Sequence, residues 1–174
     1  MLQFNLNRTL EILERTPVVL ENLLFGLSEE WLYNNEGKKT WSPYDVLGHL
    51  IVGEKTDWLV RVKIILKSDD KHFRPFDRFA QFNEEDDREI GEMLEEFKTL
   101  RFQNLQELNA FHISENDLKQ TGIHPEFGTV TLSQLITTWG VHDLGHIAQI
   151  SRVMAFQHKN EVGPWISYLG ILKK

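Results

Sequence analysis

The chain has 174 residues, of which 41% are hydrophobic and 26% are charged. These proportions are typical of a folded globular protein, so we expect a single domain over residues 1–174. The formal net charge of -7 disfavours a nucleic-acid partner, because DNA-binding domains present clustered positive charge. The chain contains no cysteine, which excludes disulfides, thiolate metal ligands and a cysteine nucleophile. Any thiol chemistry would therefore use an external thiol.

The sequence gives no sign of membrane insertion or export. No apolar run reaches the roughly 18 residues needed to span a bilayer. The segment Met1–Thr9 has neither the charged leader nor the apolar centre of a signal peptide. We therefore expect a soluble, cytoplasmic protein with no membrane partner.

Leucines at helical spacing predict a first helix over residues 4–25, ending at Gly26. Pro17 lies inside this segment, and a proline removes one backbone donor from a helix. We therefore predict a kink or a restart at Pro17, with Thr16 as its cap. The polar stretch 34–39 then forms a loop.

A second helix is predicted to begin at Ser42, where Pro43 and Asp45 complete a first-turn proline and an approximate capping box. It is expected to continue to about Lys67. The next segment, residues 68–83, has no clear period and predicts a long ordered loop. Its phenylalanines are expected to pack against the core: Phe73, Phe76, Phe79 and Phe82.

Eight acidic residues lie within residues 84–96. Carboxylates stabilise the positive end of a helix dipole, and apolar residues at positions 90, 93, 94 and 97 continue with helical spacing. We therefore interpret the acidic run as the solvated start of a third helix that continues to about Phe111. A binding tail is the alternative.

A fourth helix is predicted over residues 132–157 from apolar residues at helical spacing. A loop with a short β-prone stretch, residues 129–131, precedes it. After it, Pro164 with Trp165 and Tyr168 predicts a short helix that packs over one end of a bundle. The whole pattern predicts an all-α four-helix bundle with a short C-terminal helix.

Three histidines are candidate metal ligands. His142 and His146 are spaced i and i+4, so their imidazoles lie on one helix face, close enough to share a metal ion. Two half-exposed histidines are the alternative interpretation. His49 lies in the middle of the second predicted helix among apolar residues, where a buried imidazole needs a partner. The residues alone leave open whether His49 is a core histidine or a third ligand.

The segment 142–146 also resembles a zincin motif, in which two histidines bracket a glutamate general base. Asp143 occupies the glutamate position and has a shorter side chain. The extended metzincin pattern fails, because Gln149 and Arg152 stand in the places of its glycine and third histidine. A peptidase is therefore weakly supported.

Several other residues are candidates for supporting the site. Asp57 and Asp45 could orient the imidazoles, or could be ordinary surface or capping residues. Glycine destabilises a helix interior, which is more easily explained where a backbone or a ligand approaches closely. Gly48, Gly140 and Gly145 are glycines of this kind.

The remaining charged and imidazole side chains carry weaker predictions. His72, His112 and His158 lie at loops or helix ends and are expected to be solvated. A run of cations is interleaved with acidic residues and so predicts no anion-binding patch: Arg61, Lys63, Lys67, Lys71, Arg74 and Arg78.

Short motifs over nearly the whole chain together resemble the DinB/YfiT-like family. These are Trp41-Ser-Pro-Tyr-Asp-Val-Leu-Gly-His49-Leu, Arg74-Pro-Phe-Asp-Arg-Phe-Ala-Gln-Phe, His124-Pro-Glu-Phe-Gly, His142-Asp-Leu-Gly-His146-Ile-Ala-Gln and Gly163-Pro-Trp. The resemblance implies an up-down-down-up bundle that holds one divalent metal ion, nickel or zinc, through His49, His142 and His146. It also implies a homodimer, and a small-molecule thiol and an electrophile as substrates, because relatives include thiol-dependent S-transferases. His124 has no assigned role.

Three functions remain open at this point. Three imidazoles leave a coordination position free on a divalent ion, as in catalytic sites. A thiol at that position would lose its proton, which predicts a metal-dependent thiol S-transferase. Water there would also be activated, so a hydrolase with Asp143 as base is an alternative. A non-catalytic metal- or ligand-binding bundle is the third.

Overall fold

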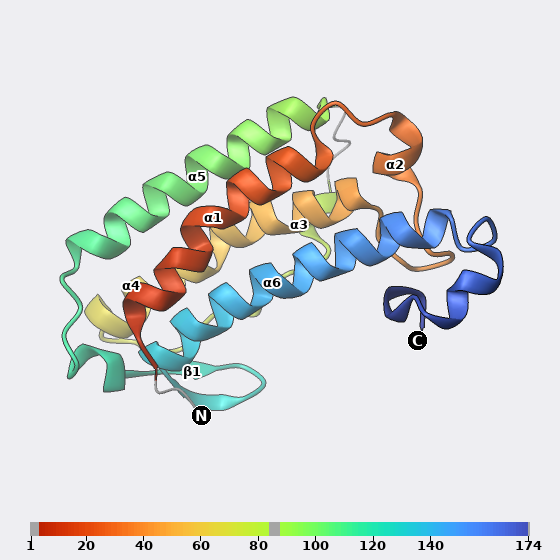
Figure 1. The fold of residues 1–174 in the computed structure, drawn as a ribbon. Helices are drawn as coiled ribbons and strands as arrows, with labels where there is room; N and C mark the ends of the chain where they lie inside the picture. Colours follow the sequence, from red (N-terminus) through yellow and green to blue (C-terminus); the bar gives the residue numbers. More distant parts are fainter. Residues whose placement is uncertain (1–3, 84–87, 174) are drawn as a thin grey trace.

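The structure is a computed structural model that describes residues 4–83 and 88–173. Four helical columns form a bundle (Figure 1): α1 (Leu6–Leu24), α3 (Pro43–Thr56) continued by α4 (Trp58–Lys67), α5 (Ile90–Ala110) and α6 (Leu132–Gln157). Helices α1 and α6 run in one direction, and α3 and α5 run in the other. Helix α1 packs against α5 and α6, and α3 packs against the same two. The predicted four-helix bundle is therefore confirmed.

The smaller elements lie between and after these helices. They are α2 (Glu29–Tyr33), the strands β1 (Thr121–His124) and β2 (Gly128–Thr131), and the 3-10 turns η1 (Ala80–Phe82), η2 (Asp117–Lys119), η3 (Gly163–Ser167) and η4 (Gly170–Leu172). Within the described residues, every helix is too short or too polar to cross a lipid bilayer.

Helix α1 runs without interruption through Pro17. The predicted restart is therefore wrong, and Thr16 does not cap a new helix, because its hydroxyl donates to the carbonyl of Ile12 at 3.1 Å. The helix instead tolerates the missing donor of Pro17, which leaves the carbonyl of Leu13 without its usual partner four residues later. A side chain from another helix replaces that partner, as described below.

The second predicted helix begins as expected but is divided in two. Ser42 is the N-cap of α3, and Ser42 and Asp45 form a reciprocal capping box. Asp45 is therefore a capping residue and not a partner of the histidines. The interruption is at Asp57, whose φ of -119° departs from the usual helical value, and α4 begins at Trp58.

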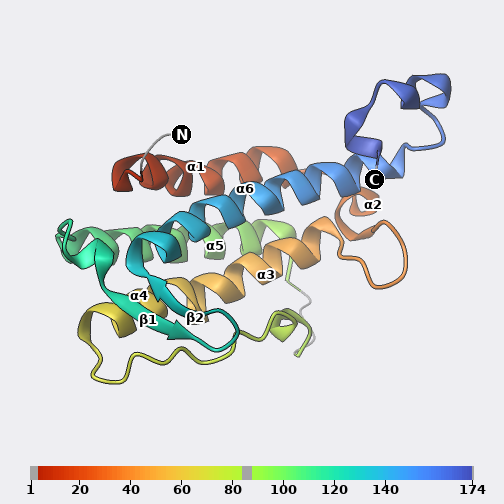
Figure 2. The same cartoon turned by 90° about the horizontal axis from the view of Figure 1, so that it is seen from below.

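The long connection between α4 and α5 follows from the topology. Because α3 and α5 run in the same direction, the chain must return along the bundle before α5 begins. Figure 2 shows this segment running beside the β1–β2 hairpin. Phe73 is buried and Phe76 is half-buried, as predicted, but Phe79 and Phe82 are about half exposed and contact the Trp41 ring. For these two, the prediction of core packing is wrong.

The third helix begins later than predicted. Glu89 is the N-cap of α5, and its side chain forms a capping box with Glu92. The acidic residues 84–87 lie outside the described residues. The helix ends at Ala110, with Phe111 as the C-cap, in agreement with the predicted end.

The segments on either side of α6 differ from the prediction in detail. The β-prone stretch pairs with residues 121–124 in an antiparallel hairpin, in which Gly122 lies opposite Val130. The C-terminal tail forms two 3-10 turns. Trp165 and Tyr168 are 68% and 83% exposed, so they do not pack over the bundle as predicted. They contact each other instead, with ring centroids 6.5 Å apart.

The interior consists of two apolar clusters with buried polar side chains between them. One cluster fills the end of the bundle near the hairpin: Leu10, Leu13, Trp58, Leu59, Val62, Ile65, Phe73, Leu105, Leu108, Leu132, Leu135, Ile136 and Trp139. The other fills the opposite end: Leu20, Leu24, Leu32, Val46, Leu47, Leu50, Ile51, Met93, Leu94, Phe97 and Ile150. Along each helix, a buried polar residue separates the two sets: Thr16, Glu54, Arg101 and Asp143.

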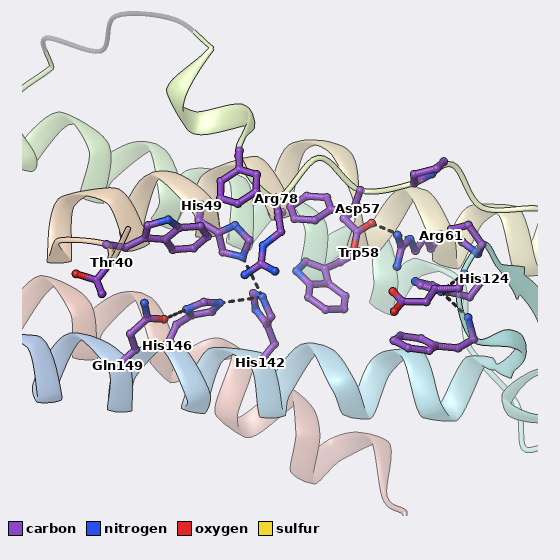
Figure 3. Close-up of a pocket in the computed structure, with 18 of the residues that line it drawn as sticks. Thr40, His49, Asp57, Trp58, Arg61, Arg78, His124, His142, His146 and Gln149 are labelled. Carbon is purple, nitrogen blue, oxygen red and sulfur yellow. Dashed lines mark hydrogen bonds and ion pairs between the residues drawn. The ribbon is translucent and has the colours of Figure 1, made fainter. Parts of the chain in front are cut away.

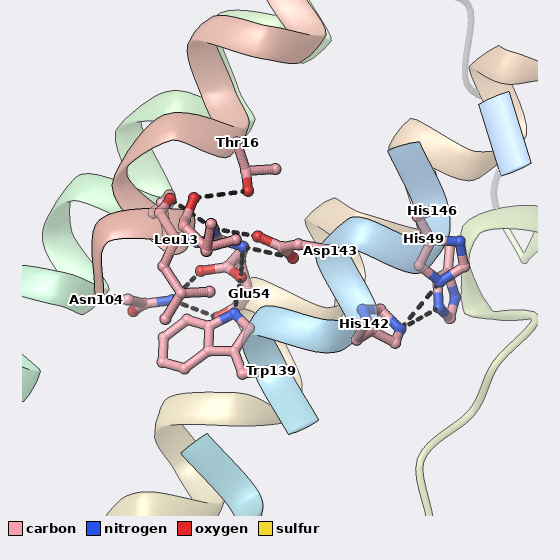
Figure 4. Close-up of polar contacts among 11 residues, drawn as sticks. Leu13, Thr16, His49, Glu54, Asn104, Trp139, His142, Asp143 and His146 are labelled. Carbon is pink, nitrogen blue, oxygen red and sulfur yellow. Dashed lines mark hydrogen bonds and ion pairs between the residues drawn. The ribbon is translucent and has the colours of Figure 1, made fainter. Parts of the chain in front are cut away.

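Arg101 is the centre of this polar layer, because its guanidinium bonds to both buried carboxylates. Figure 4 labels its partners Leu13, Glu54 and Asp143. Its NH1 and NH2 donate to the two carboxylate oxygens of Asp143 at 2.6 and 3.1 Å, and NH2 also donates to Glu54 at 2.8 Å. Trp139 and Asn104 donate to the Glu54 carboxylate, each at 2.9 Å. Burial alone would lower the pKa of Arg101, but the two carboxylates hold this pKa above its ordinary value. The guanidinium therefore stays charged in the core.

The same guanidinium also reaches α1. NH1 of Arg101 donates to the carbonyl of Leu13 at 2.8 Å, the carbonyl that Pro17 leaves free. Arg101 thus joins α1, α3 and α6 to its own helix, α5. The bundle is held together at one level by hydrogen bonds to a single side chain.

We predict that Arg101→Met lowers the free energy of unfolding by about 3–5 kcal/mol, because it leaves two buried carboxylates without their cation. Urea unfolding followed by circular dichroism measures this change. Arg152→Met is the matched control, since Arg152 is about half exposed and its pair with Glu36 should contribute about 0–1 kcal/mol. Equal losses in the two variants would contradict a structural role for the buried network.

Candidate metal centre

Three imidazoles converge between α3 and α6 (Figure 3). His49 comes from the middle of α3, and His142 and His146 lie one turn apart on α6. Nε2 of His142 lies 3.2 Å from Nε2 of His49 and 3.0 Å from Nε2 of His146. Tetrahedral ligands with bonds of 2.0–2.1 Å lie about 3.3 Å apart, so this spacing fits a shared ion. The ligand atoms of all three lie within 4.8 Å of one another.

The hydrogen bonds around the ring nitrogens also suit a cation at this point. Nδ1 of His146 lies 2.9 Å from the side-chain oxygen of Gln149, so the proton is on Nδ1 and the Nε2 lone pair faces the other rings. Nδ1 of His49 and Nδ1 of His142 are buried with no partner among the described residues. Converging lone pairs repel one another unless a proton or a metal ion lies between them.

The site keeps its imidazoles neutral. Burial, together with the neighbouring His146, lowers the pKa of His49 to about 4 and that of His142 to about 3. Burial also lowers the pKa of His146. Metal ligands must be unprotonated, so the three histidines can bind a cation at neutral pH without first losing protons.

Aromatic rings surround the histidines on the side of the cavity. The rings of Trp41 and Phe76 lie 4.9 and 5.5 Å from that of His49, and the Trp58 ring lies 5.0 Å from that of His142. These rings restrict the rotation of the imidazoles and exclude water from their sides. The three aromatic rings thus form part of the wall around the histidines.

The histidines lie in the wall of a cavity of about 960 Å³, large enough for a small-molecule substrate. Two ion pairs lie along the wall: Arg152 donates twice to Glu36, each at 2.9 Å, and Arg61 donates to Asp57 at 2.7 Å. The Arg78 guanidinium lies over the rings of Phe79 and Trp41 at 5.3 and 6.0 Å. Among the described lining residues, cationic side chains outnumber carboxylates: Lys39, Arg61, Arg78 and Arg152 against Glu36, Asp57 and Glu126.

Comparison with known proteins places the chain in a family. The model of the DinB superfamily matches residues 12–150. The chain belongs to the DinB superfamily. Among solved structures it is similar to YfiT from Bacillus subtilis, described as a probable metal-dependent hydrolase with an unusual four-helix bundle topology. The two share 19% sequence identity with a TM-score of 0.73, over 91% of this chain and 87% of YfiT. No curated protein matches the sequence.

Asp143 is not available as the base of this DinB-superfamily site. Its side chain is fully buried and accepts two hydrogen bonds from Arg101, and it points in another direction from the imidazoles (Figure 4). Adjacent residues in an α-helix differ by about 100° around the axis, so Asp143 and His142 point in different directions. The sequence prediction of a base at position 143 is wrong for this reason.

Asp57 is also not a partner of the histidines. Its carboxylate is buried and pairs with Arg61, four residues later. Burial outweighs the opposing effect of the Arg61 cation and raises the pKa of Asp57 to about 6. The side chain that does orient an imidazole is Gln149. Its position three residues after His146 is the only sequence signal that could have indicated this role.

The other predicted positions are placed as follows. His72, His112 and His158 are exposed, as predicted, and His72 pairs with Asp70 at 2.7 Å. His124 lines the same cavity as the three candidate ligands, and the sequence did not predict this position. Arg61 and Arg78 also line the cavity, although the charge pattern predicted no anion site there.

The glycines near the histidines have different reasons for lacking a side chain. A Cβ at Gly48 would lie 3.2 Å from Gln81, and a Cβ at Gly140 would lie 3.0 Å from Thr9. Close packing therefore explains these two, as predicted. A Cβ at Gly145 would meet no described protein atom within 4 Å, so a close approach by the backbone does not explain this glycine.

We predict that the metal-free protein loses stability as the pH falls from about 6.5 towards 4. Over this range the unfolded chain binds protons at the positions of His49 and His142, whereas the folded chain does not, so acid favours unfolding. Asp57 opposes this trend, because its raised pKa lets the folded chain take up a proton below about pH 6. The two histidines contribute more to the pH dependence of the free energy of unfolding than the one aspartate, so the net effect of acid is destabilising.

Urea unfolding at pH 7, 6 and 5 in the presence of a chelator measures this dependence. His142→Gln should reduce the slope by up to one proton, since one of the two groups is removed. Asp57→Asn should make the slope steeper, since the opposing group is removed. A slope that His142→Gln leaves unchanged would contradict the prediction.

Proposed function

We propose that the protein is a metal-dependent thiol S-transferase whose single divalent ion, nickel or zinc, is bound by His49, His142 and His146. The observation that carries this proposal is the convergence of three neutral Nε2 atoms, 3.0 and 3.2 Å apart, in the wall of a large cavity. Imidazole suits both metals, and the ligand set does not choose between them.

The chain supplies the ligands, their orientation and the surroundings of the reaction. When bound, a divalent ion with three imidazole ligands keeps a coordination position open and promotes loss of the proton from a thiol or a water molecule there. Gln149 fixes the ring of His146, and the aromatic wall limits access by other nucleophiles. In the transfer, the thiol sulfur forms a bond to an electrophilic carbon, and the leaving group departs together with the thiol proton.

The charges of the cavity favour a thiol over a water nucleophile. Two of its carboxylates, on Glu36 and Asp57, are held in ion pairs, and Asp143 is buried elsewhere. The third, Glu126, lies in the turn beside His124, so a reaction that requires a free carboxylate base next to the three histidines is poorly served. The excess of cationic side chains suits an anionic co-substrate, as small cellular thiols commonly are.

Metal-dependent hydrolysis is the second candidate. It is favoured by the similarity of the fold to that of YfiT, which is described as a probable metal-dependent hydrolase. Water at the open position would then be the nucleophile. The homodimer and the cytoplasmic location implied at the sequence level remain predictions, and sedimentation at micromolar concentration tests the former.

We predict that untagged protein binds one nickel or zinc ion per chain and that His49→Ala, His142→Ala and His146→Ala each lose it. Gln149→Leu should weaken metal binding by about 10–100-fold, because it removes only the partner of one ligand. His72→Ala is the matched control and should retain the metal. Elemental analysis of the purified variants measures this, and full occupancy in His142→Ala would contradict the ligand assignment.

We predict that cysteine added to the nickel-loaded protein produces a sulfur-to-nickel charge-transfer band in the near ultraviolet. The band should be absent in His142→Ala, because the metal is lost. Hydrolysis of p-nitrophenyl acetate without any thiol provides the competing measurement. Metal-dependent ester hydrolysis with no sulfur-to-nickel band would favour the hydrolase over the transferase.

A further inference from the structure

The cavity continues beyond the three histidines to a second polar end. His124, the last residue of β1, and Arg61, in the first turn of α4, both lie there (Figure 3). The motif that contains His124 has no part in the proposed metal site. Its position in the same cavity requires a separate explanation.

His124 is held in one protonation form by the turn that follows it. Its Nδ1 accepts hydrogen bonds from the backbone N–H groups of Glu126 and Phe127, at 3.1 and 3.2 Å. Its ring stacks on that of Phe127, with centroids 4.5 Å apart and planes 12° apart. Because Nδ1 accepts, the neutral ring carries its proton on Nε2. His124 therefore offers a fixed N–H donor at the cavity wall.

Arg61 offers a second donor that has no protein acceptor. Its side chain is only 9% exposed, and its Nε donates to Asp57 at 2.7 Å. Its NH2 is buried and has no partner among the described residues. A buried donor without an acceptor is costly, and a guanidinium presents a planar fork that matches an oxyanion. An arrangement of this kind is expected where a ligand supplies the missing acceptor.

The Phe73 ring contacts both donors, Arg61 and His124. The Arg61 guanidinium lies over the Phe73 ring at 5.2 Å, and the edge of His124 meets the same ring at 6.4 Å. The backbone N–H of Phe73 donates to Ile123 at 2.9 Å, which ties the long loop to the hairpin. Gly122 leaves room for this ring, because a Cβ there would lie 2.4 Å from it. Arg61 and His124 are thus built into one local arrangement.

We propose that Arg61 and His124 bind the anionic end, a carboxylate or a phosphate, of an elongated substrate whose sulfur or electrophilic carbon lies at the three histidines. This proposal rests on the proposed function and names the class of its substrate. At about 1.5 Å per helical residue, His49 and Arg61 lie about 18 Å apart along the path of α3 and α4. A ligand that reaches both ends is therefore an extended molecule with an oxyanion far from its reacting atom.

Two thiols of equal length test this proposal in the nickel-loaded protein. 11-Mercaptoundecanoic acid and 11-mercaptoundecan-1-ol share the thiol and the chain and differ in the charged end. Isothermal titration calorimetry should show that the acid binds at least tenfold more tightly than the alcohol. Equal binding of the two by the wild-type protein would overturn the proposal.

The variants separate recognition from folding. His124→Asn keeps a side-chain acceptor for the turn and removes the Nε2 donor, and Arg61→Lys keeps a cation beside Asp57 and removes the planar fork. Each should reduce the preference for the acid to less than threefold. Lys63→Arg is the matched control and should keep it, because Lys63 is also on α4, pairs with Glu107 and does not line the cavity. A tenfold preference that survives in both His124→Asn and Arg61→Lys would overturn the proposal.

A metal-free measurement distinguishes this proposal from the proposed function. Acetate and inorganic phosphate, titrated separately into metal-free protein, should shift the NMR signals of His124 in the wild type and not in Arg61→Lys. The anion that binds more tightly shows whether the anionic end of the substrate is a carboxylate or a phosphate. If anions shift the His124 signals of the metal-free protein but the nickel-loaded protein binds no thiol, the anion site is supported and the transferase is refuted. Shifts with neither anion would overturn the anion site.

Discussion

The charge on Arg101 is the constraint on which the geometry of this bundle depends. A guanidinium in an apolar interior is tolerated only where acceptors surround it, and here they come from three other helices. On α6 the acceptor is Asp143, the immediate neighbour of His142. The rotation of α6 that satisfies Arg101 therefore leaves His142 and His146 on a different face of the helix, towards His49. One orientation of α6 therefore places both the polar layer in the core and the histidine cluster.

The path of the chain explains why the cavity has walls on several sides. Because α3 and α5 run parallel, a long segment must cross the bundle, and it brings Phe76 and Arg78 to the histidines. The β1–β2 hairpin pairs with that segment through Phe73 and Ile123 and contributes His124. The helices thus supply the candidate ligands, and the connections supply most of the surface that a substrate would meet.

Sequence reasoning was most reliable where the signal was local. Helical spacing paired His142 with His146, and the capping box located the start of α3. It failed where the outcome depended on a partner distant in the sequence: Asp143 resembled a general base because nothing nearby indicates that Arg101, 42 residues away, binds it. His49 entered as a third ligand through a family resemblance, since spacing alone cannot show which helix faces α6.

Pro17 fixes the position of α1 along the bundle axis relative to the other helices. In a regular helix every interior carbonyl already accepts from the chain, so one turn looks the same as the next to a neighbouring helix. The missing N–H of Pro17 makes the carbonyl of Leu13 different from the others, and Arg101 donates to it. If α1 slid by one turn, Arg101 would meet a carbonyl that already accepts one hydrogen bond from its own helix. A proline in the middle of α1 thus favours one register in the packing of the four helices.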